Sequence, residues 1–354
     1  MSAIDWTQPM IQSFEYYIVD PISWRDTKKI DNVKSSSITR DSTVETLGSA
    51  TIDIIESVGE CYVRTYLIAV QNGIVEKVPL GTHLVQTPSS SYNGKTRNVT
   101  MDAYTPLIEL KENPPELGYS ILKDENIMER AYQLTRENVR APVIRTINET
   151  NLTTDFVSQS EDTWISFLTD LIANAKHTFD LDEMGRILYS PIQDTASLQP
   201  VWTFTDDNSS ILLPEITLDH DLFDIPNVVE VIYTSGRDYF YSKVVNDDVN
   251  SPTSTVNRGR IKKYRAINPS LGGIPTQAMI DEYANRLMKN LSTVEYTVKY
   301  SHGYCPVRPG DCVRLNYKSA GIVDVKAKVT SQSIKCDTGC TVSETAVFTS
   351  KLWG

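Results

Sequence analysis

Four residues that could do chemistry lie close together in the stretch YSHGYCPVRPGDCVRLNY, residues 300–317. They are His302, Cys305, Asp311 and Cys312, which could serve a metal site or a catalytic cluster. Zinc sites usually bring their cysteines as close pairs, about two to four residues apart. Cys305 and Cys312 lie too far apart in the sequence for that pattern, so they do not form such a pair.

A second pair of cysteines could complete a four-thiolate zinc site. Cys336 and Cys340 flank Asp337-Thr338-Gly339, and this tripeptide is favoured at the tip of a hairpin. The spacing of the four thiols fits hairpins better than a closed metal site. We therefore expect no metal, and we expect these cysteines to be buried small residues or to form a local disulfide.

The alternative to a chemical cluster is a turn between strands. Residues 293–300 alternate apolar and polar side chains, as a half-buried strand does. Pro306 and Pro309 then remove two backbone donors, and Gly310 accepts a positive φ, so a sheet ladder cannot run through. Alternation resumes at Val313, and we expect an antiparallel meander through residue 329.

The remaining candidates for catalysis are weak. Asp337-Thr338-Gly339 matches the aspartic protease tripeptide, but it occurs once and at an expected hairpin tip. The four histidines are scattered, and none forms an H-E-x-x-H pair; they are His83, His177, His220 and His302. The segment LDHDLFD offers Asp219, Asp221 and Asp224 near His220, but it lacks the glycine bend of a calcium loop. We expect no catalytic, cofactor-binding or metal-binding residues.

The composition is that of a globular protein with several domains. The chain has 354 residues, of which 40% are hydrophobic and 22% charged. We expect no membrane anchor and no secretory signal, because long apolar runs are missing and the N-terminus lacks a basic start. Its five cysteines are then expected to be reduced. A net charge of -11 argues against binding to nucleic acid through phosphates.

Residues 1–113 have the pattern of a β domain. Two apolar runs are joined at Asn72-Gly73, the strongest short hairpin signal. A second Asn-Gly, at 93 and 94, precedes another alternating strand. Pro114-Pro115 then marks a boundary, since neither residue can donate to a ladder.

Residues 114–215 are predicted to be a small α+β insert. One amphipathic helix follows Asp124 as its cap, and another follows Ser160. The segment FDLDEMGRILYSPI predicts two strands around a turn at Gly185. From 216 to 354 the β pattern returns, and it is interrupted by a helix near 276–291.

Three segments resemble the bacteriophage tail or baseplate hub proteins related to late control protein D. They are KSSSITRDSTVETLGSATIDI (34–54), NVVEVIYTSGRDYFYSKVVNDDVNSPTSTVNRGR (227–260) and RPGD (308–311) with its following strand. DLDEMGRILYSPI (180–192) also resembles the hairpin of the family's insert. Together these segments extend from near residue 34 to the end of the chain.

The resemblance implies an α+β, predominantly β protein with two tail-tube-like antiparallel β domains, 1–113 and 216–354, around the insert 114–215. It also implies a non-enzymatic homotrimer that joins the hexameric tail tube to a trimeric spike or tip and lines the DNA channel. The implied partners are a tail tube or distal tail protein, the spike or tip protein and a tape measure protein. Its place would be the virion tail, assembled in the host cytoplasm.

A carbohydrate- or peptide-hydrolysing protein on a β scaffold is the alternative. Its carboxylates would come from the loop around Asp219 to Asp224 or from Asp337. Two carboxylates about 5–10 Å apart in a groove with exposed aromatic residues would favour this alternative.

The turn interpretation of residues 306–311 can be tested by two substitutions. Gly310→Val should lower the free energy of unfolding by about 1–3 kcal/mol, because valine strains a left-handed backbone. Asp311→Asn should leave assembly intact. Denaturant titration and the mass in solution measure both, and a hydrolytic activity abolished by Asp311→Asn in a folded protein would contradict the interpretation.

Overall fold

The structure is a computed structural model that describes residues 4–56, 58–92, 94–95, 97–207, 210–235, 238–270 and 275–353. Strands dominate, and most of the helical residues lie in a small central segment and in one later helix. The predicted fold class, predominantly β with a small α+β insert, is confirmed. None of the helices in these ranges is long and apolar enough to cross a membrane.

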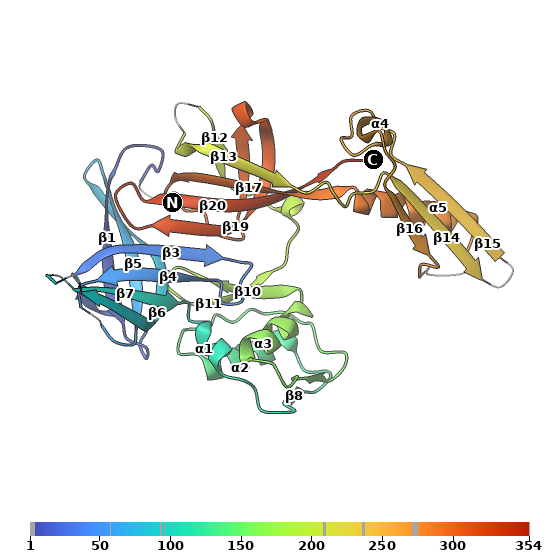
Figure 1. The fold of residues 1–354 in the computed structure, drawn as a ribbon. Helices are drawn as coiled ribbons and strands as arrows, with labels where there is room; N and C mark the ends of the chain where they lie inside the picture. The colour runs from blue at the N-terminus through green and yellow to red at the C-terminus, as the bar shows by residue number, and fades with distance from the viewer. Residues whose placement is uncertain are drawn as a thin grey trace. The chain divides into compact units, whose positions relative to one another are not determined.

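The elements follow one another along the chain as labelled in Figure 1. The strands up to the insert hairpin are β1 (Ile11–Val19), β2 (Asp26–Ile30), β3 (Val33–Asp41), β4 (Gly48–Ile54), β5 (Cys61–Gln71), β6 (Ile74–Tyr92), β7 (Arg97–Tyr104), β8 (Ser120–Ile121), β9 (Phe156–Val157), β10 (His177–Leu181) and β11 (Ile187–Pro191). The later strands are β12 (Pro200–Thr205), β13 (Leu212–His220), β14 (Val228–Ser235), β15 (Asp238–Val245), β16 (Lys263–Ile267), β17 (Thr293–Gly303), β18 (Cys312–Tyr317), β19 (Ile322–Lys335) and β20 (Thr341–Lys351). The helices are α1 (Ile108–Glu112), α2 (Ile127–Asn138), α3 (Trp164–Ala173), α4 (Thr255–Arg258), α5 (Gln277–Leu291) and the short 3-10 helices η1 (Thr195–Ser197) and η2 (Lys318–Ala320).

The chain forms two compact units. The first unit is Met1–Ile216 with Lys299–Ala346, and the second is Thr217–Val298 with Val347–Gly354. C-terminal residues therefore pack with the N-terminal β region, an arrangement that a linear division of the chain does not include. The predicted domain boundaries at 113/114 and 215/216 stay a prediction.

One large sheet contains most of the strands, in the order β13-β17-β20-β19-β3-β4-β7-β6-β5-β1-β2. The N-terminal strands β1 to β7 and the C-terminal strands meet where β3 pairs antiparallel with β19. β18 lies off this path, antiparallel to the first half of β19 and parallel to β12. The sheet therefore depends on pairing between the two ends of the chain.

The predicted meander through residues 293–329 is wrong in one respect. β18 and β19 do form an antiparallel hairpin, but β17 lies beside β20 and not beside β18. Residues 304–311 are too long and too proline-rich to make a tight hairpin, and Gly310 has the expected positive φ of 96°. The final strand therefore occupies the place between β17 and β19.

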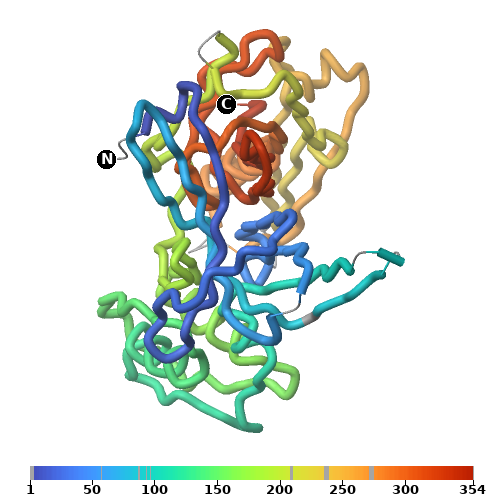
Figure 2. The backbone as a smooth tube through the Cα atoms, turned by 90° about the vertical axis from the view of Figure 1, so that its left-hand side faces the viewer, coloured from blue at the N-terminus to red at the C-terminus, as the bar shows by residue number. Residues whose placement is uncertain are grey.

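The hairpin predicted at Asn72-Gly73 is confirmed. It joins β5 to β6, and both residues have positive φ, 52° and 80°, as a type I′ turn requires. The second predicted Asn-Gly turn falls partly outside the described residues, at Asn93, although β7 follows it as expected. In Figure 2 the end of β6 and the start of β7 project away from the rest of the first unit.

The two insert helices form where predicted, but they begin later. Asn126 caps α2 through the backbone N–H of Glu129, in place of Asp124, which adopts a positive φ of 68°. Thr163 caps α3 in a reciprocal capping box with Ser166, in place of Ser160. The predicted hairpin at Gly185 is confirmed as β10 and β11.

The apolar face of the insert shares its core with the first β region. The helix residues Leu134, Phe167 and Leu171 belong to one buried cluster with Trp24 and Tyr62, which flank or belong to strands of the large sheet. The cluster stabilises the insert because the helices alone are too short to be stable without packing.

The second unit contains a three-stranded sheet covered on one face by a helix. Its order is β15-β14-β16, with β15 antiparallel and β16 parallel to β14. The predicted helix near 276–291 is α5, and Thr276 caps it. Ile280, Ala284 and Met288 pack against the strands of this sheet.

The close contact between β3 and β4, in the first unit, can be tested by substitution. Gly48 has a φ of 134°, and a Cβ there would lie 2.1 Å from the carbonyl oxygen of Thr39. Gly48→Ala should lower the free energy of unfolding by about 3 kcal/mol or more, since backbone strain and overpacking each cost about 1–3 kcal/mol. Gly118→Ala is the control, because it has a positive φ of 78° but open space around it. Its cost should be only about 1–2 kcal/mol, and equal losses in urea titrations would contradict the proposed clash.

Candidate functional site

The four chemical residues of the stretch 300–317 do not form one site. His302 and Cys305 are buried at the end of β17, and Cys312 is buried at the start of β18. Asp311 instead lines a cleft on the other side of the turn. The chain turns between these positions, so their closeness in the sequence does not bring the four side chains into one site.

His302 belongs to a buried polar cluster that joins β17, β19 and β20. Its Nε2 lies 3.2 Å from Oε1 of Glu344, at ion-pair distance but without the alignment of a hydrogen bond. The hydroxyl of Tyr300 donates to Oε2 of Glu344 at 2.6 Å, and Nε2 of Gln332 donates to Oε1. Burial, reinforced by Glu344, raises the pKa of Tyr300 well above its ordinary value. The carboxylate thus has partners on both oxygens.

The sequence analysis missed Glu344, although a signal for it exists. Val342, Glu344 and Ala346 alternate along β20 and are all buried, so the period-two pattern places the carboxylate on the apolar face. A lone acid on the buried face of a strand indicates a partner inside the core, because an unpaired buried charge is costly.

Cys305, His302 and Glu344 have the residue types of a cysteine nucleophile, a base and an orienting acid. Sγ of Cys305 lies 3.8 Å from Nδ1 of His302. However, Nδ1 also lies 2.6 Å from the carbonyl oxygen of Gly303, which can only accept a proton. Burial and then Glu344 raise the pKa of the thiol well above its ordinary value, and the side chain is only 1% exposed. The arrangement lacks a thiolate and access for a substrate.

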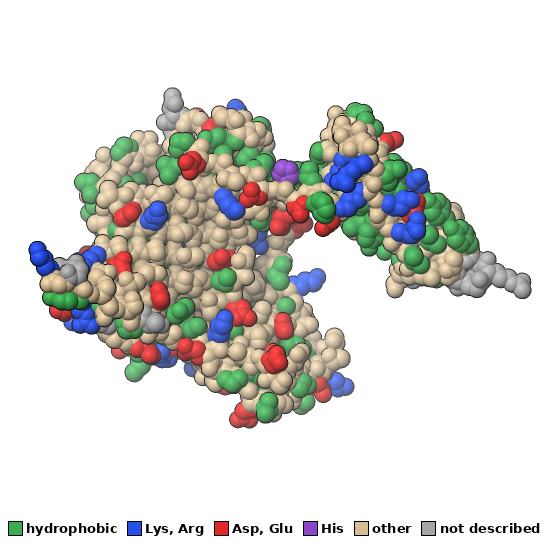
Figure 3. Space-filling model, in the orientation of Figure 1, with side chains coloured by type: hydrophobic (Ala, Val, Ile, Leu, Met, Phe, Trp, Pro, Cys, Tyr) green, Lys and Arg blue, Asp and Glu red, His purple; other side chains and the backbone are tan. Residues whose placement is uncertain are grey.

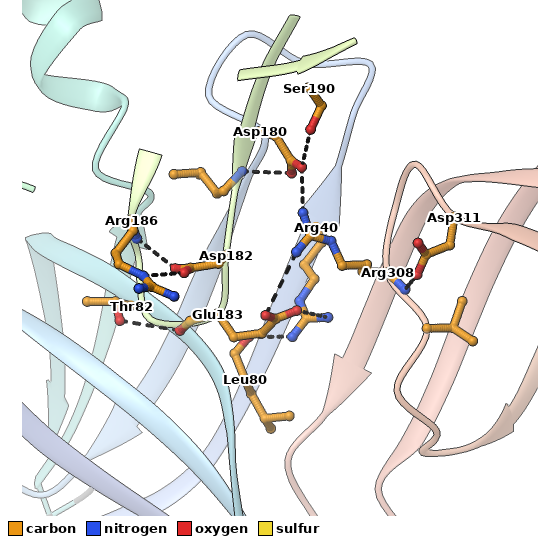
Figure 4. A network of polar contacts seen from close by, with 12 residues as sticks. Arg40, Leu80, Thr82, Asp180, Asp182, Glu183, Arg186, Ser190, Arg308 and Asp311 are labelled. Carbon is orange, nitrogen blue, oxygen red and sulfur yellow. Dashed lines mark hydrogen bonds and ion pairs between the residues drawn. The ribbon is translucent and has the colours of Figure 1, made fainter. Parts of the chain in front are cut away.

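A cleft of about 480 Å³ lies in the first unit, between the insert hairpin, β3, β6 and the 308–311 turn. Figure 4 shows the charged side chains that converge there from these segments. Arg308 Nη2 lies 2.6 Å from Oδ2 of Asp180, and its Nη1 lies 4.0 Å from Oε2 of Glu183. Arg40 Nη1 lies 3.6 Å from the other oxygen of Glu183. Two arginines therefore face the carboxylates of the hairpin.

Burial raises the pKa of the Asp311 carboxyl above its ordinary value. Its Oδ2 accepts the backbone N–H of Arg308 at 2.9 Å, which closes the turn. Asp180 accepts from the hydroxyl of Ser190 at 2.8 Å and from the N–H of Leu181 at 2.8 Å. These contacts fix the turn and the hairpin, while the ion pairs of Arg308 and Arg40 join the segments. Together they occupy the carboxylates that a hydrolase would need free.

The tip of the insert hairpin is fixed to the large sheet by buried donors. The indole Nε1 of Trp24 donates to the carbonyl oxygen of Met184 at 2.7 Å, and Nη2 of Arg64 donates to the same oxygen at 3.0 Å. Arg64 is 1% exposed, and it also contacts Oγ1 of Thr82 at 2.8 Å and Oδ1 of Asp26 at 2.7 Å. Gly185 allows the close approach, since a Cβ there would lie 2.7 Å from Thr82.

The other predicted candidates lie outside the cleft or are inert. Asp337 is at an exposed turn between β19 and β20, where Gly339 has a φ of 93°, so the hairpin prediction is confirmed. Oδ1 of Asp221 accepts the N–H of Phe223, and Asp224 pairs with Lys262 at 3.0 Å. In the second unit, His220 stacks on Tyr296, with ring centroids 4.8 Å apart.

Two further histidines of the first unit, His83 and His177, are buried. His83 lines the cleft, but burial and then Arg40 lower its pKa to about 3, so it is neutral at physiological pH. Nδ1 of His177 lies 2.7 Å from the carbonyl oxygen of Ala175. Across the described ranges, no three His, Cys, Asp or Glu side chains form a group that could hold a metal ion. All five cysteines are free, and Cys305, Cys312, Cys336 and Cys340 are buried, so the first of the two predicted alternatives, buried small residues, is the one observed.

The anchoring role of Arg64 can be tested by its removal. Arg64→Met should lower the free energy of unfolding by about 3 kcal/mol, because it takes the buried donor from Oδ1 of Asp26 and from Oγ1 of Thr82 and leaves the Met184 carbonyl with Trp24 alone. Hydrogen exchange of residues 182–186 should accelerate as well.

Lys29→Met is the matched control, since it removes an exposed ion pair of the same 2.7 Å length, with Glu15. It should cost less than about 1 kcal/mol. Equal losses from the two substitutions would show that Arg64 has no anchoring role.

Comparisons with known proteins identify the fold. No protein-family model matches the sequence, and no curated protein matches it at a significant level. The structure is similar to that of a tail protein from Neisseria meningitidis MC58, with a TM-score of 0.61 and 12% identity over 95% of this chain and 96% of that one. A 43 kDa tail protein of prophage MuSo2 from Shewanella oneidensis gives a TM-score of 0.61 and 11% identity over 95% and 98%.

A chain of the Francisella PdpA-VgrG complex is also similar, with a TM-score of 0.55 and 9% identity over 96% of this chain and 58% of that chain. At these identities the likeness concerns the fold alone. The resemblance that the sequence motifs predicted is confirmed at that level: the chain has the fold of phage tail proteins.

Proposed function

We propose that this protein is a structural hub of a phage tail, a homotrimeric ring that joins a hexameric tail tube to a trimeric spike or tip. The observation that carries the proposal is similarity from end to end: two tail proteins match 95% of this chain over nearly their whole lengths. A shared domain inside a larger enzyme would leave much of one chain unmatched.

In this proposal the β-rich segments 1–113 and 216–354 form the ring, and the insert 114–215 faces outward or toward the tip. Three chains would then place six tube-like β domains around one axis, which matches a hexameric tube. The hydrogen-bonded order of the large sheet ends at β13, whose residues are exposed or half-buried along its whole length. A closed ring is one way to cover such an edge, which otherwise invites aggregation.

The charge of the chain supports a channel that DNA passes without binding. The second unit contains as many Lys and Arg as Asp and Glu, so the net charge of -11 belongs to the first unit. Negative charge repels phosphates, and it therefore favours sliding over adhesion.

The proposed partners are a tail tube or distal tail protein, a spike or tip protein and a tape measure protein. The proposed place is the virion, after assembly in the host cytoplasm.

The proposal includes no enzymatic activity. The cleft carboxylates face arginines, and the one cysteine with a histidine beside it is buried. The carboxylates suggested for a hydrolase, Asp219 to Asp224 and Asp337, do not line the cleft. No specific observation favours the hydrolase alternative.

The mass of the purified protein in solution tests the proposal. Light scattering after size-exclusion chromatography should give three times the chain mass of 39.8 kDa, and electron micrographs should show rings with threefold symmetry. A monomer at every concentration and salt level, together with no labelling of tails by an antibody to this chain, would refute the hub assignment.

A further inference from the structure

The sheet of the second unit has one face that α5 does not cover, and we call it the open face. Its members follow from strand register, because Tyr233 and Phe240 pair with each other and both pack toward α5. Their neighbours along the strands therefore point the other way. The open face consists of Val228, Glu230, Ile232 and Thr234 of β14, Tyr239, Tyr241, Lys243 and Val245 of β15, and Lys263, Arg265 and Ile267 of β16. Val228 and Glu230 are buried, and the other residues are half-buried or exposed.

Contacts between side chains confirm this assignment. Glu230 of β14 pairs with Lys263 at 2.7 Å and with Arg265 at 2.9 Å, and it accepts from the hydroxyl of Tyr241 at 3.1 Å. These residues come from all three strands, so they share one side of the sheet.

The open face combines exposed apolar and aromatic groups with positive charge. Tyr239 is 63% exposed and Ile267 is 66% exposed. Glu230 is the one carboxylate among the face residues defined above, and it faces three cations, since Lys243 lies opposite it in the register of β14 and β15. Lys263 and then Arg265 lower the pKa of Glu230 to about 2, so this carboxylate is ionised at physiological pH. Three cations against one carboxylate leave the face with an excess of positive charge. Figure 3 shows Lys and Arg side chains beside hydrophobic ones on this sheet.

The basic run at 258–265 contributes less to this face than its sequence suggests. Arg258 donates to the carbonyl oxygens of Ile225 and Leu222, and Lys262 contacts Phe223 and Asp224. These two cations hold the loop before β14. The remaining cations are interspersed with tyrosine and isoleucine around a carboxylate, a mixture typical of protein interfaces and unfavourable for a phosphate backbone.

The charge that complements this face is present on the chain itself. The first unit holds the whole net charge of -11, while the second unit is neutral overall and positive on its open face. In a ring of identical subunits, attraction between this positive face and the acidic first unit of a neighbour would speed association, and repulsion between like charges would disfavour other pairings.

We infer that the open face of the second unit binds the acidic first unit of a second copy of this chain. Tyr239, Tyr241 and Ile267 supply the apolar contact, and Lys243, Lys263 and Arg265 supply the charge. The inference rests on the proposed homotrimer and names a surface through which its subunits contact one another.

Cross-linking between labelled copies tests this contact directly. A photoreactive benzoylphenylalanine replaces Tyr239 in protein with heavy isotopes, which is mixed with unmodified light protein before assembly. Illumination should join position 239 to light peptides from Met1–Ile216 or Lys299–Ala346. The same probe at Val249, an exposed position of the second unit that is not among the open-face residues, should not do so. Cross-links from 239 only to the second unit, or equal cross-links from both positions, would overturn the inference.

Matched substitutions give a second, independent test. Ile267→Asp and Val249→Asp place the same charge at positions that are 66% and 67% exposed. Ile267→Asp, alone or with Lys243→Glu, should raise the dissociation constant of the trimer at least tenfold, while Val249→Asp should leave it unchanged. Added salt should weaken the wild-type trimer more than the double variant.

The outcomes separate this inference from the proposed function. A wild-type monomer would defeat both. A wild-type trimer whose dissociation constant does not change in the Ile267 variants would overturn only the open face as its interface. Binding of labelled single-stranded DNA by the wild type that is lost in the Lys243→Glu variant would also overturn it, because it would identify a nucleic acid as the occupant.

Discussion

The pairing of β3 with β19 is the constraint on which the rest of the first unit depends. Ser37 to Asp41 lie opposite Ser331 to Lys335, so the two ends of the chain share one continuous sheet. Gln332 on β19 contacts Arg40 on β3, although 292 positions separate them in the sequence. The same pairing places the turn at 308–311 beside the insert hairpin, where Arg308 and Arg40 face Asp180 and Glu183. Closing so long a loop is entropically costly, and buried apolar strands on both sides compensate for that cost.

Polar groups in the interior of the first unit connect segments that are distant in the sequence. Arg64 connects β5 to the hairpin of the insert, and Glu344 connects β20 to β17 and β19. Each is buried, so its removal would leave partner groups without compensation, a larger penalty than the loss of an exposed ion pair. Such buried polar contacts specify how segments meet, whereas apolar contacts alone would tolerate several arrangements. This explains why residue types that suggest catalysis, such as the histidine, cysteine and glutamate near the end of β17, have a structural environment.

Charge is distributed unevenly between the two units, and this distribution links the fold to the proposed assembly. A chain that were uniformly acidic would repel its own copies as strongly as it repels DNA. Here the second unit has no net charge and collects cations around Glu230 on one face of its sheet. A ring built from such chains can keep DNA from adhering and still contain attractive contacts between subunits.

Local patterns in the sequence determined the local elements and the fold class. Alternation predicted the strands, Asn72-Gly73 predicted its hairpin because both positions need positive φ, and the apolar stripe after Thr276 predicted α5. Helix starts were less accurate: Asp124 and Ser160 were plausible caps, but the backbone geometry selected Asn126 and Thr163. The short motifs, taken together, also indicated the fold of phage tail proteins.

Only the tertiary structure decided which distant segments meet. No local pattern places β20 between β17 and β19, because alternation specifies which face a residue occupies and not which strand lies beside it. For the same reason the cleft was missed: Arg40, Asp180 and Arg308 lie in three segments that share no sequence signal. The converse holds at 300–317, where a turn was predicted: Asp311 is close in sequence to His302 and Cys305, yet only Asp311 of the three lines the cleft. Residues that are close in sequence are reliably close in space only within one element. A site formed by several elements can therefore be identified only from how those elements pack.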